Sequence, residues 1–200
     1  MKDPAYTVEC ARIHDTAAML NLEREYFDPC WHSEAALIRG LIEQEPRMFR
    51  VCKVNGKVKG YYWVFPLEHS IWNQIISGEM PEGDLVKHIR SFDEPDLYLY
   101  ISSVIVDQTD KLRKSYTKAL VHDFGRRFVL GNNSAAPDVR AIGAFTISEG
   151  GRRLMERAKF SYQGKFRAHG KEMKSWAIDR RTLAHQTISD RQQRQTRKIA

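Results

Sequence analysis

A short stretch, VIVDQTDKLRKSYTKALV, combines basic and hydroxyl-bearing side chains where a β-prone segment gives way to a helix-forming one. Free backbone N–H groups gather where a helix begins, so such a position can hold a phosphate group. Ser115 and Thr117 carry hydroxyls that can donate to phosphate. The cations beside them are Lys111, Arg113 and Lys114. The pattern indicates an anion-binding turn that lacks the usual glycine; the alternative is a solvated basic turn whose helix is capped by Ser115.

Cysteine and histidine could also do chemistry, and their spacing argues against a metal site. Cys10, Cys30 and Cys52 form no CxxC or CxxH pair. Cys30 and His32 flank Trp31, but no third or fourth ligand lies at a useful spacing. Each cysteine lies in or next to an apolar segment, and we therefore expect buried, reduced thiols and no metal.

Length and composition fit one ordinary globular domain. The chain has 200 residues, of which 42% are hydrophobic and 28% charged, and these fractions are typical of soluble proteins with a real core. No apolar run approaches the ~20 residues that a membrane helix needs. The N-terminal MKDPAYTVEC lacks the apolar core of a signal peptide. We therefore expect a cytoplasmic protein without a membrane partner.

The charge balance is basic, with a formal net charge of +7 and an isoelectric point of about 9.4. A basic surface favours anionic partners such as nucleotides, nucleic acid or acidic proteins, without choosing among them. Much of the excess lies in residues 181–200, which are polar and poor in large apolar side chains. This segment is predicted to be a disordered or loosely helical tail, either solvated or serving as a nucleic-acid arm.

Two helices are predicted near the start of the chain. Asp15 can cap a helix that continues to about Phe27, because apolar residues recur there at the three-and-four spacing of one buried face. Ser33 can cap a second helix, whose apolar stripe ends before Pro46. These two segments form the first part of the expected element order.

A hairpin and an insertion are predicted next. The β-prone runs MFRVCKV and KVKGYYWVF flank Asn55-Gly56, and this dipeptide is the strongest short hairpin signal because both turn positions need positive φ. Residues 69–96 contain the short helical pieces IWNQII and DLVKHI around the turn GEMPEGD. We interpret them as an insertion, since neither piece could bury a core alone.

The second half alternates strands and helices. DLYLYISSVIV is predicted to be a central strand, followed by a helix ending near Gly131, the strand VRAIGAFTI, the helix GGRRLMERAKF and a hairpin across His169-Gly170. The expected order is α, α, β, β, insertion, β, α, β, α, β, β. This order predicts an α/β protein in which a mixed sheet has helices on both faces, in one domain over residues 1–180.

That element order resembles the GNAT acyltransferase superfamily over nearly all of the chain except the tail. LEREYFDPCWHSEAALIRGLI is similar to the family's first two helices, and VCKVNGKVKGYYWV is similar to its hairpin. LMERAKF resembles the helix ending LYEKLGF, with Met155 in place of tyrosine and Lys159 in place of glycine. The resemblance implies a GNAT-like mixed sheet.

The resemblance also implies an acyl-CoA cofactor, acetyl-CoA or another. The family's loop has the pattern Arg/Gln-x-x-Gly-x-Gly/Ala, and its backbone N–H groups hold the coenzyme A pyrophosphate. Here Leu112 takes the first position, and Ser115 and Thr117 take the glycine positions. The implied cofactor-binding residues are Val104, Ile105, Val106, Lys111, Leu112, Arg113, Lys114, Ser115, Tyr116, Thr117 and Ser148.

The usual acid and base of the family are missing. Members commonly use a glutamate on the central strand, where this chain has Tyr100, and a tyrosine on the last helix, where it has Met155. A glutamate sometimes found on the next strand would fall at Gly143. The catalytic candidates are Tyr100 as a relay or weak acid, Ser148 near the thioester and Glu149 beside it. Their alternatives are a core aromatic, a helix cap and a first-turn dipole partner, respectively.

The implied activity is acyl transfer, most simply acetyl transfer, to the amine of a small molecule or protein. Acylation of an RNA-linked amine such as aminoacyl-tRNA and a catalytically silent GNAT-like binding module remain open, as does a homodimer. Apolar residues of the insertion either line a pocket for a longer acyl chain or an apolar acceptor, or pack on the sheet. These residues are Ile71, Trp72, Ile75 and Ile76.

Overall fold

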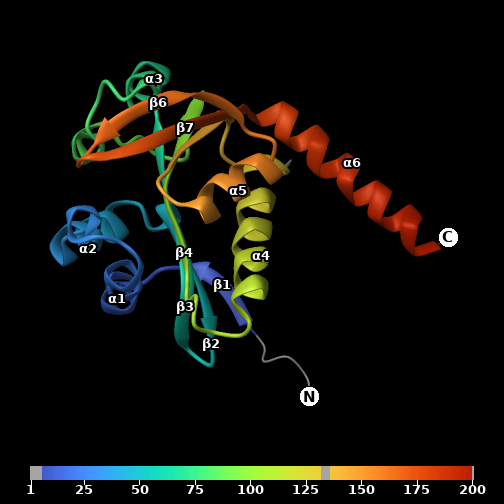
Figure 1. Ribbon diagram of the computed structural model, residues 1–200, viewed down its shortest axis with the longest axis horizontal. Coiled ribbons are helices and arrows are strands. Elements are labelled where there is room, and N and C mark those ends of the chain that lie inside the picture. Colours follow the sequence, from blue (N-terminus) through green and yellow to red (C-terminus); the bar gives the residue numbers. More distant parts are fainter. Residues whose placement is uncertain (1–5, 132–135, 200) are drawn as a thin grey trace. The chain divides into compact units, whose positions relative to one another are not determined.

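The computed structural model describes residues 6–131 and 136–199, with side chains as far as residue 189 (Figure 1). Its seven strands form one mixed sheet in the order β1-β2-β3-β4-β5-β7-β6, which confirms the predicted α/β class. The strands are β1 (Tyr6–Cys10), β2 (Phe49–Val54), β3 (Lys57–Leu67), β4 (Leu97–Val106), β5 (Val139–Thr146), β6 (Ser161–Ala168) and β7 (Lys171–Asp179).

In the described part of the chain, six α-helices and several short helical turns lie between or after the strands. The helices are α1 (Thr16–Tyr26), α2 (Ala35–Gln44), α3 (His69–Ser77), α4 (Arg113–Phe124), α5 (Glu149–Arg157) and α6 (Arg180–Ile199). The turns are η1 (Ile13–Asp15), η2 (Pro29–Trp31), η3 (Pro46–Met48), η4 (Glu82–His88) and the π-type η5 (Gly125–Val129). Helix α6 follows β7 directly, so the segment predicted to be a disordered or loosely helical tail forms a regular helix.

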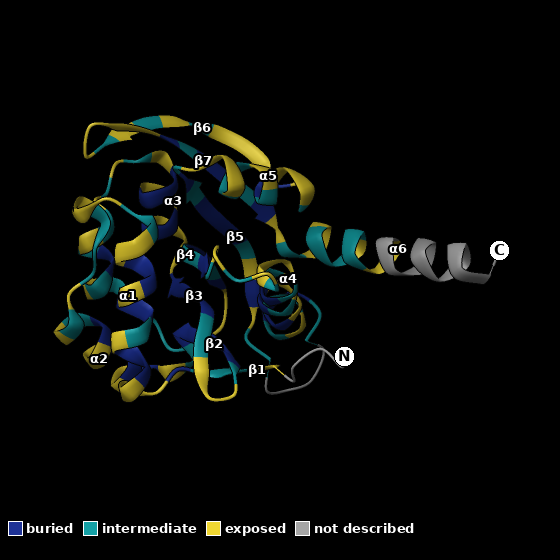
Figure 2. Ribbon diagram, turned by 60° about the horizontal axis from the view of Figure 1, so that its bottom comes forward, coloured by how far each residue is buried: buried dark blue, intermediate teal, exposed yellow. Residues whose placement is uncertain are grey.

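The chain divides into two compact units. The first unit comprises Met1–Phe65 with Ile101–Gly125, and the second comprises Pro66–Tyr100 with Arg126–Ala200. In the first unit β1 and β2 are antiparallel, as are β2 and β3. The predicted Asn55-Gly56 turn is confirmed, because both residues have positive φ, 48° and 76°. In the second unit β7 pairs antiparallel with both β5 and β6, and β6 is exposed along much of its length (Figure 2).

Some details of the sequence prediction were wrong. Strand β1 was missed, because its five residues are at most half-buried and follow too short a pattern. Ser33 does not cap α2; its N–H and hydroxyl both donate to the carboxylate of Glu23, at 2.8 and 2.9 Å, and Glu34 occupies the cap position. Of the three thiols, which are all free, Cys52 is buried as expected but Cys30 is exposed.

A buried ion pair anchors α4 on the first three strands in the first unit. The Arg50 guanidinium donates to both carboxylate oxygens of Asp123, at 3.0 and 3.1 Å, and the Tyr62 hydroxyl donates to the same carboxylate at 2.8 Å. The side chains of the pair are only 3% and 5% exposed. A charge at this depth depends on its partner, because water cannot replace the lost interaction.

Replacing Asp123 with asparagine should therefore destabilise the fold strongly. The variant leaves the Arg50 guanidinium buried without its counter-charge, and we expect a loss of about 3–5 kcal/mol in the free energy of unfolding. Urea unfolding followed by circular dichroism measures this quantity. Glu172→Gln is the control, since it breaks the exposed Lys165–Glu172 pair and should change the free energy of unfolding far less. Equal losses in the two variants would contradict the interpretation.

Candidate functional site

The turn between β4 and α4 is shaped by two carboxylates of its own. Asp107 Oδ1 accepts the N–H groups of Thr109 and Asp110 at 3.1 and 3.2 Å, and the Thr109 hydroxyl at 2.7 Å. Asp110 Oδ1 accepts the N–H of Leu112 at 2.9 Å. These side-chain acceptors satisfy the turn's backbone donors, as aspartate commonly does in tight turns. The turn therefore keeps its shape without glycine.

Lys59 of β3 neutralises both carboxylates. Its Nζ lies 3.0 Å from Asp107 and 2.9 Å from Asp110. The hydrogen bond from Thr109, followed by the one from Lys59, lowers the pKa of Asp107 to about 2. The hydrogen bonds to Asp110 and Asp107 raise the pKa of Lys59 above its usual value. Tyr116 adds a hydrogen bond to Asp110 at 3.2 Å, so the ion cluster also fixes the first turn of α4.

Helix α4 begins earlier than the sequence pattern suggested. Ser115 is the third residue of the helix and not its cap, since Leu112 holds the cap position. The N–H groups of Ser115 and Tyr116 both donate to the Leu112 carbonyl, at 2.8 and 3.1 Å. The Thr117 hydroxyl donates to the Arg113 carbonyl at 3.0 Å, as hydroxyls in helices often do. These donors are therefore already used inside the turn.

The donors that remain for an anion are mostly side chains. Lys111, Arg113 and Lys114 are exposed, and none of them forms an ion pair with another described residue. Within the described ranges the N–H groups of Lys111 and Lys114 make no hydrogen bond, so both can reach an anion at the positive end of the helix dipole. The half-exposed Ser115 hydroxyl lies in the same turn. Tyr116, only 1% exposed, belongs to the core.

The end of β4 approaches β3 unusually closely. A Cβ placed on Gly60 would lie 2.7 Å from the Ile105 carbonyl oxygen and 3.1 Å from the Val106 Cα, so only glycine fits there. Ile105 and Val106 are buried and Val104 is half-buried. These three residues complete the strand that leads into the turn, as expected; a role for their backbone in binding a cofactor stays a prediction.

Tyr100 is a core residue of the second unit. Its side chain is 1% exposed, and its ring centroid lies 5.2 Å from that of Phe145. Burial raises the pKa of Tyr100 well above its usual value, and the charge of Glu82 and a hydrogen bond to it raise it further. Sequence reasoning missed Glu82, the first residue of η4; the signal available was an acidic residue after proline in the turn GEMPEGD.

Ser148 and Glu149 have the structural roles that were their alternatives. Ser148 caps α5, since its Oγ accepts the N–H of Gly151 at 3.1 Å. Glu149 binds Arg152 at 2.6 Å and Arg153 at 3.0 Å. Hydrogen bonds from these arginines lower the pKa of Glu149 to about 2, so it has no proton to donate at neutral pH. Ser148 and Glu149 as catalytic groups, and Ser148 as a cofactor contact, remain predictions.

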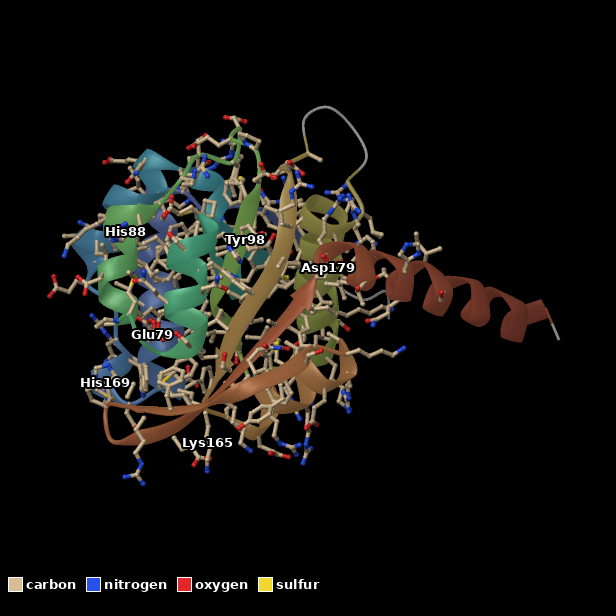
Figure 3. The ribbon with its side chains drawn as sticks, turned by 90° about the horizontal axis from the view of Figure 1, so that it is seen from above. Glu79, His88, Tyr98, Lys165, His169 and Asp179 are labelled. Carbon is tan, nitrogen blue, oxygen red and sulfur yellow. The ribbon has the colours of Figure 1, made fainter. Side chains whose placement is uncertain are left out.

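The insertion packs its apolar face on the sheet of the second unit. The residues Ile71, Trp72, Ile75 and Ile76 are all buried. A Cβ on Gly143 of β5 would lie 2.4 Å from Ile76 Cδ1 and 3.0 Å from Trp72 Cζ2, and Trp72 Nε1 donates to the Leu99 carbonyl at 2.9 Å. Of the two alternatives, packing on the sheet is therefore the one observed. Figure 3 labels two residues of this insertion: Glu79, which lies just after α3, and His88, which is the last residue of η4.

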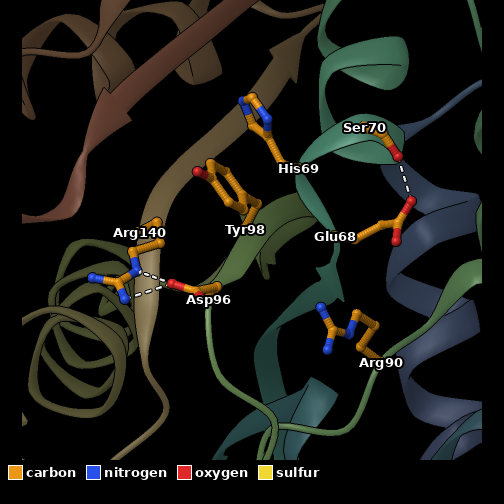
Figure 4. A pocket seen from close by; sticks show the side chains of 7 residues that line it. All are labelled: Glu68, His69, Ser70, Arg90, Asp96, Tyr98 and Arg140. Carbon is orange, nitrogen blue, oxygen red and sulfur yellow. Dashed lines mark hydrogen bonds and ion pairs between the residues drawn. The ribbon is translucent and has the colours of Figure 1, made fainter.

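A solvent-open pocket of about 460 Å³ lies in the second unit (Figure 4). The His69 and Tyr98 rings lie 4.6 Å apart along one side. Arg140 is bound by Asp96 at 2.6 Å, and Arg90 is bound by Glu94 at 2.8 Å. Because its arginines already have carboxylate partners, the pocket offers no excess charge to an anion. Among the described residues no cluster of three metal-ligating side chains occurs.

Replacing Asp107 with asparagine tests the ion cluster through its pH dependence. The pKa of Asp107 is lowered from 3.8 to about 2 on folding, so its contribution is present above about pH 4 and is lost as the pH falls towards about 2. This shift corresponds to about 2 kcal/mol at neutral pH. We therefore expect urea unfolding to show a less stable variant at pH 7 and a flatter loss of stability between pH 4 and 2. The control Asp84→Asn removes an exposed carboxylate and should leave both quantities nearly unchanged; a normal acid profile in Asp107→Asn would contradict the assignment.

The similarity to known proteins is visible in three dimensions and not in sequence. No family model and no curated protein matches the chain, and among the described helices none is long and apolar enough to span a bilayer. The loading GNATL domain of CurA from Lyngbya majuscula superposes with a TM-score of 0.70 at 10% identity, over 89% of this chain and 99% of that one. A GNAT-like decarboxylase, GphF, in complex with isobutyryl-CoA gives 0.63 at 11%, over 88% and 100%. Diaminobutyrate acetyltransferase EctA from Paenibacillus lautus, in complex with its substrate and coenzyme A, gives 0.56 at 15%, over 88% and 96%. The chain therefore has the fold of the GNAT acyltransferases.

Proposed function

We propose that this protein is an acyl-CoA-dependent N-acyltransferase, most simply an acetyltransferase, whose acceptor is an amine of a small molecule or protein. The observation that carries the proposal is the group of unpaired cations at the start of α4, directly after β4. On this fold, coenzyme A or an acyl-CoA is bound in EctA and GphF. A pyrophosphate is the kind of anion that a helix start with free cations accepts.

The roles of individual residues follow from their contacts. Lys111, Arg113 and Lys114 supply charge to the diphosphate, and the Ser115 hydroxyl and the free N–H groups of the two lysines supply hydrogen bonds. Lys59 serves a different purpose, because it keeps the two turn carboxylates neutralised. Without it, Asp107 and Asp110 would repel the incoming phosphates. The backbone of Val104–Val106 is proposed to bind the pantetheine arm.

The chemistry requires proton removal and positioning. An ammonium group cannot attack a thioester, so the acceptor must lose one proton before its nitrogen bonds to the carbonyl carbon. The C–S bond then breaks, and the coenzyme A thiolate takes up the amine's second proton. Holding the two reactants in line supplies several kcal/mol of the rate enhancement. A cytoplasmic location fits this donor and the three free thiols.

A second candidate is chemistry on the acyl group without an amine. The GNAT-like decarboxylase with the same fold is the precedent, and decarboxylation needs no base to deprotonate an acceptor. The resemblance places an ionisable group at two positions where this chain has Gly143 and Met155. Neither residue can transfer a proton, and both therefore favour a reaction without an amine. An RNA-linked amine and a silent binding module are the remaining alternatives.

Calorimetric titration with acetyl-CoA tests the cofactor site. We expect micromolar binding by the wild type and at least tenfold weaker binding by Arg113→Glu and Ser115→Asp, since each variant puts a negative charge at the start of α4. Lys118→Glu is the matched control for Arg113→Glu: it makes the same charge change at an exposed position later in the same helix and should change the Kd by no more than about twofold.

The ligand offers a second control. Acetyl-pantetheine lacks the diphosphate, so its binding should not respond to Arg113→Glu. If the wild type binds neither acetyl-CoA nor longer acyl-CoAs, the acyltransferase proposal is wrong. If the protein binds acetyl-CoA but releases no coenzyme A thiol with any amine of a panel, the silent binding module is supported. If it releases CO2 from malonyl-CoA, the decarboxylase is supported.

A further inference from the structure

The open pocket of the second unit is lined by none of the residues proposed for acyl transfer. Its walls come from the start of α3, the connection before β4 and the first residues of β4 and β5. Its volume of about 460 Å³ is in the range of sites that hold a whole small molecule. The pocket is therefore a candidate site for a ligand of its own.

Carboxylates outnumber cations around this pocket. Arg90 Nε donates to Glu94 at 2.8 Å. Arg140 has two carboxylate partners: its Nε donates to Asp96 at 2.6 Å, and its Nη2 lies 3.1 Å from Asp138. The two guanidinium groups thus have three carboxylate partners, so the paired groups already carry a net negative charge.

Glu68 adds a carboxylate that no cation neutralises. It precedes α3, is exposed and accepts the hydroxyl of Ser70, and it forms no ion pair with any residue that the structure describes. The neighbouring His69 brings no compensating charge, because its Nε2 accepts the Asn73 amide at 3.0 Å and must therefore carry a lone pair. An uncompensated carboxylate beside a concave surface attracts a cation.

One wall of the pocket is aromatic. The ring centroids of His69 and Tyr98 lie 4.6 Å apart, and the ring of the buried Trp72 lies 5.4 Å from that of Tyr98. Tyr98 is half-buried, and its hydroxyl makes no hydrogen bond within the described ranges. The face of a tyrosine ring attracts a cation through its quadrupole, so this wall and the carboxylates favour the same kind of ligand.

Asp96 is held in a backbone conformation that residues with a Cβ rarely adopt. Its φ is 55°, and its N–H donates to the Asp138 carboxylate at 3.2 Å. The next N–H, that of Leu97, donates to the Asp138 carbonyl at 2.9 Å. Such strain persists only where the surrounding structure fixes it, and it is concentrated at ligand sites. Figure 4 shows the Tyr98 ring between Asp96 on one side and Glu68 on the other.

We propose that this pocket binds a small organic cation, whose ammonium head is held by the Glu68 carboxylate and the face of the Tyr98 ring. An anion fits less well, because both arginines of the pocket are already paired. A metal ion also fits less well: the described residues contain no cluster of three metal-ligating side chains, and an aromatic wall offers no oxygen ligand. The inference goes beyond acyl transfer and does not depend on it.

Titration of the full chain with matched charged and neutral probes tests this site. Butylammonium and tetramethylammonium are the cations, and butanol and tert-butanol are uncharged analogues of similar shape. The readout is the NMR signal of labelled tyrosine Cζ, in which Tyr98 is identified by the loss of its signal in Tyr98→Phe. At constant ionic strength we expect this signal to shift saturably with at least one cation, at a Kd of about 1 mM or tighter. The alcohols should give no saturable shift.

Three variants separate the contributions to binding. Glu68→Gln keeps the shape of the side chain but removes its charge, and should weaken cation binding about fivefold. Tyr98→Leu removes the ring face and should weaken it about three- to tenfold, measured by calorimetry. Glu79→Gln is the matched control, because it makes the same change at an exposed position just after α3 and outside the pocket; its Kd should stay within about twofold of the wild-type value.

Three outcomes would overturn the proposal. They are the lack of a saturable shift with either cation, equal binding of the alcohols, and an unchanged Kd in Glu68→Gln. None of the titrations contains acetyl-CoA, so a failure here leaves the proposed acyltransferase activity untouched, and a failure to bind acetyl-CoA leaves this site untouched.

Discussion

The binding turn depends on one electrostatic constraint, the triad of Lys59, Asp107 and Asp110. Turns that approach phosphate usually rely on glycine, because its backbone can take conformations closed to other residues. Here carboxylate oxygens accept the N–H groups of the turn instead. That solution brings two negative charges towards a site meant for an anion, and it works only because Lys59 neutralises both. A turn without glycine therefore depends on a cation from the neighbouring strand β3.

In the second unit, packing excludes a side chain from one position of β5. Because Gly143 has no side chain, Ile76 and Trp72 can pack against the strand there. Trp72 then donates to the Leu99 carbonyl, which fixes the insertion on the strand that carries Tyr100. The insertion is therefore a fixed part of the second unit and not a loose loop on its surface.

The sequence predicted regular elements well and polar contacts poorly, for a physical reason. The Asn55-Gly56 hairpin and β4 are local patterns, because turn geometry and β-branched runs act within a few residues. Caps were assigned to Ser33 and Ser115 by the same local logic, but the structure uses Ser33 to bind Glu23 across the α1–α2 connection. Local preference cannot foresee a partner ten residues away. Glu82 was missed for the same reason, since only the folded insertion brings it to Tyr100.

The candidate activities differ in one requirement, which is whether a proton must be taken from an acceptor. Amine acylation needs a base, whereas a decarboxylase releases CO2 without deprotonating a nucleophile, and a silent module needs neither. Of the positions where the resemblance places an acid or base, Gly143 and Met155 hold no ionisable group, and the side chain of Tyr100 is 1% exposed. A base for the amine reaction must therefore come from the substrate, from solvent or from another residue, whereas the other two activities require none.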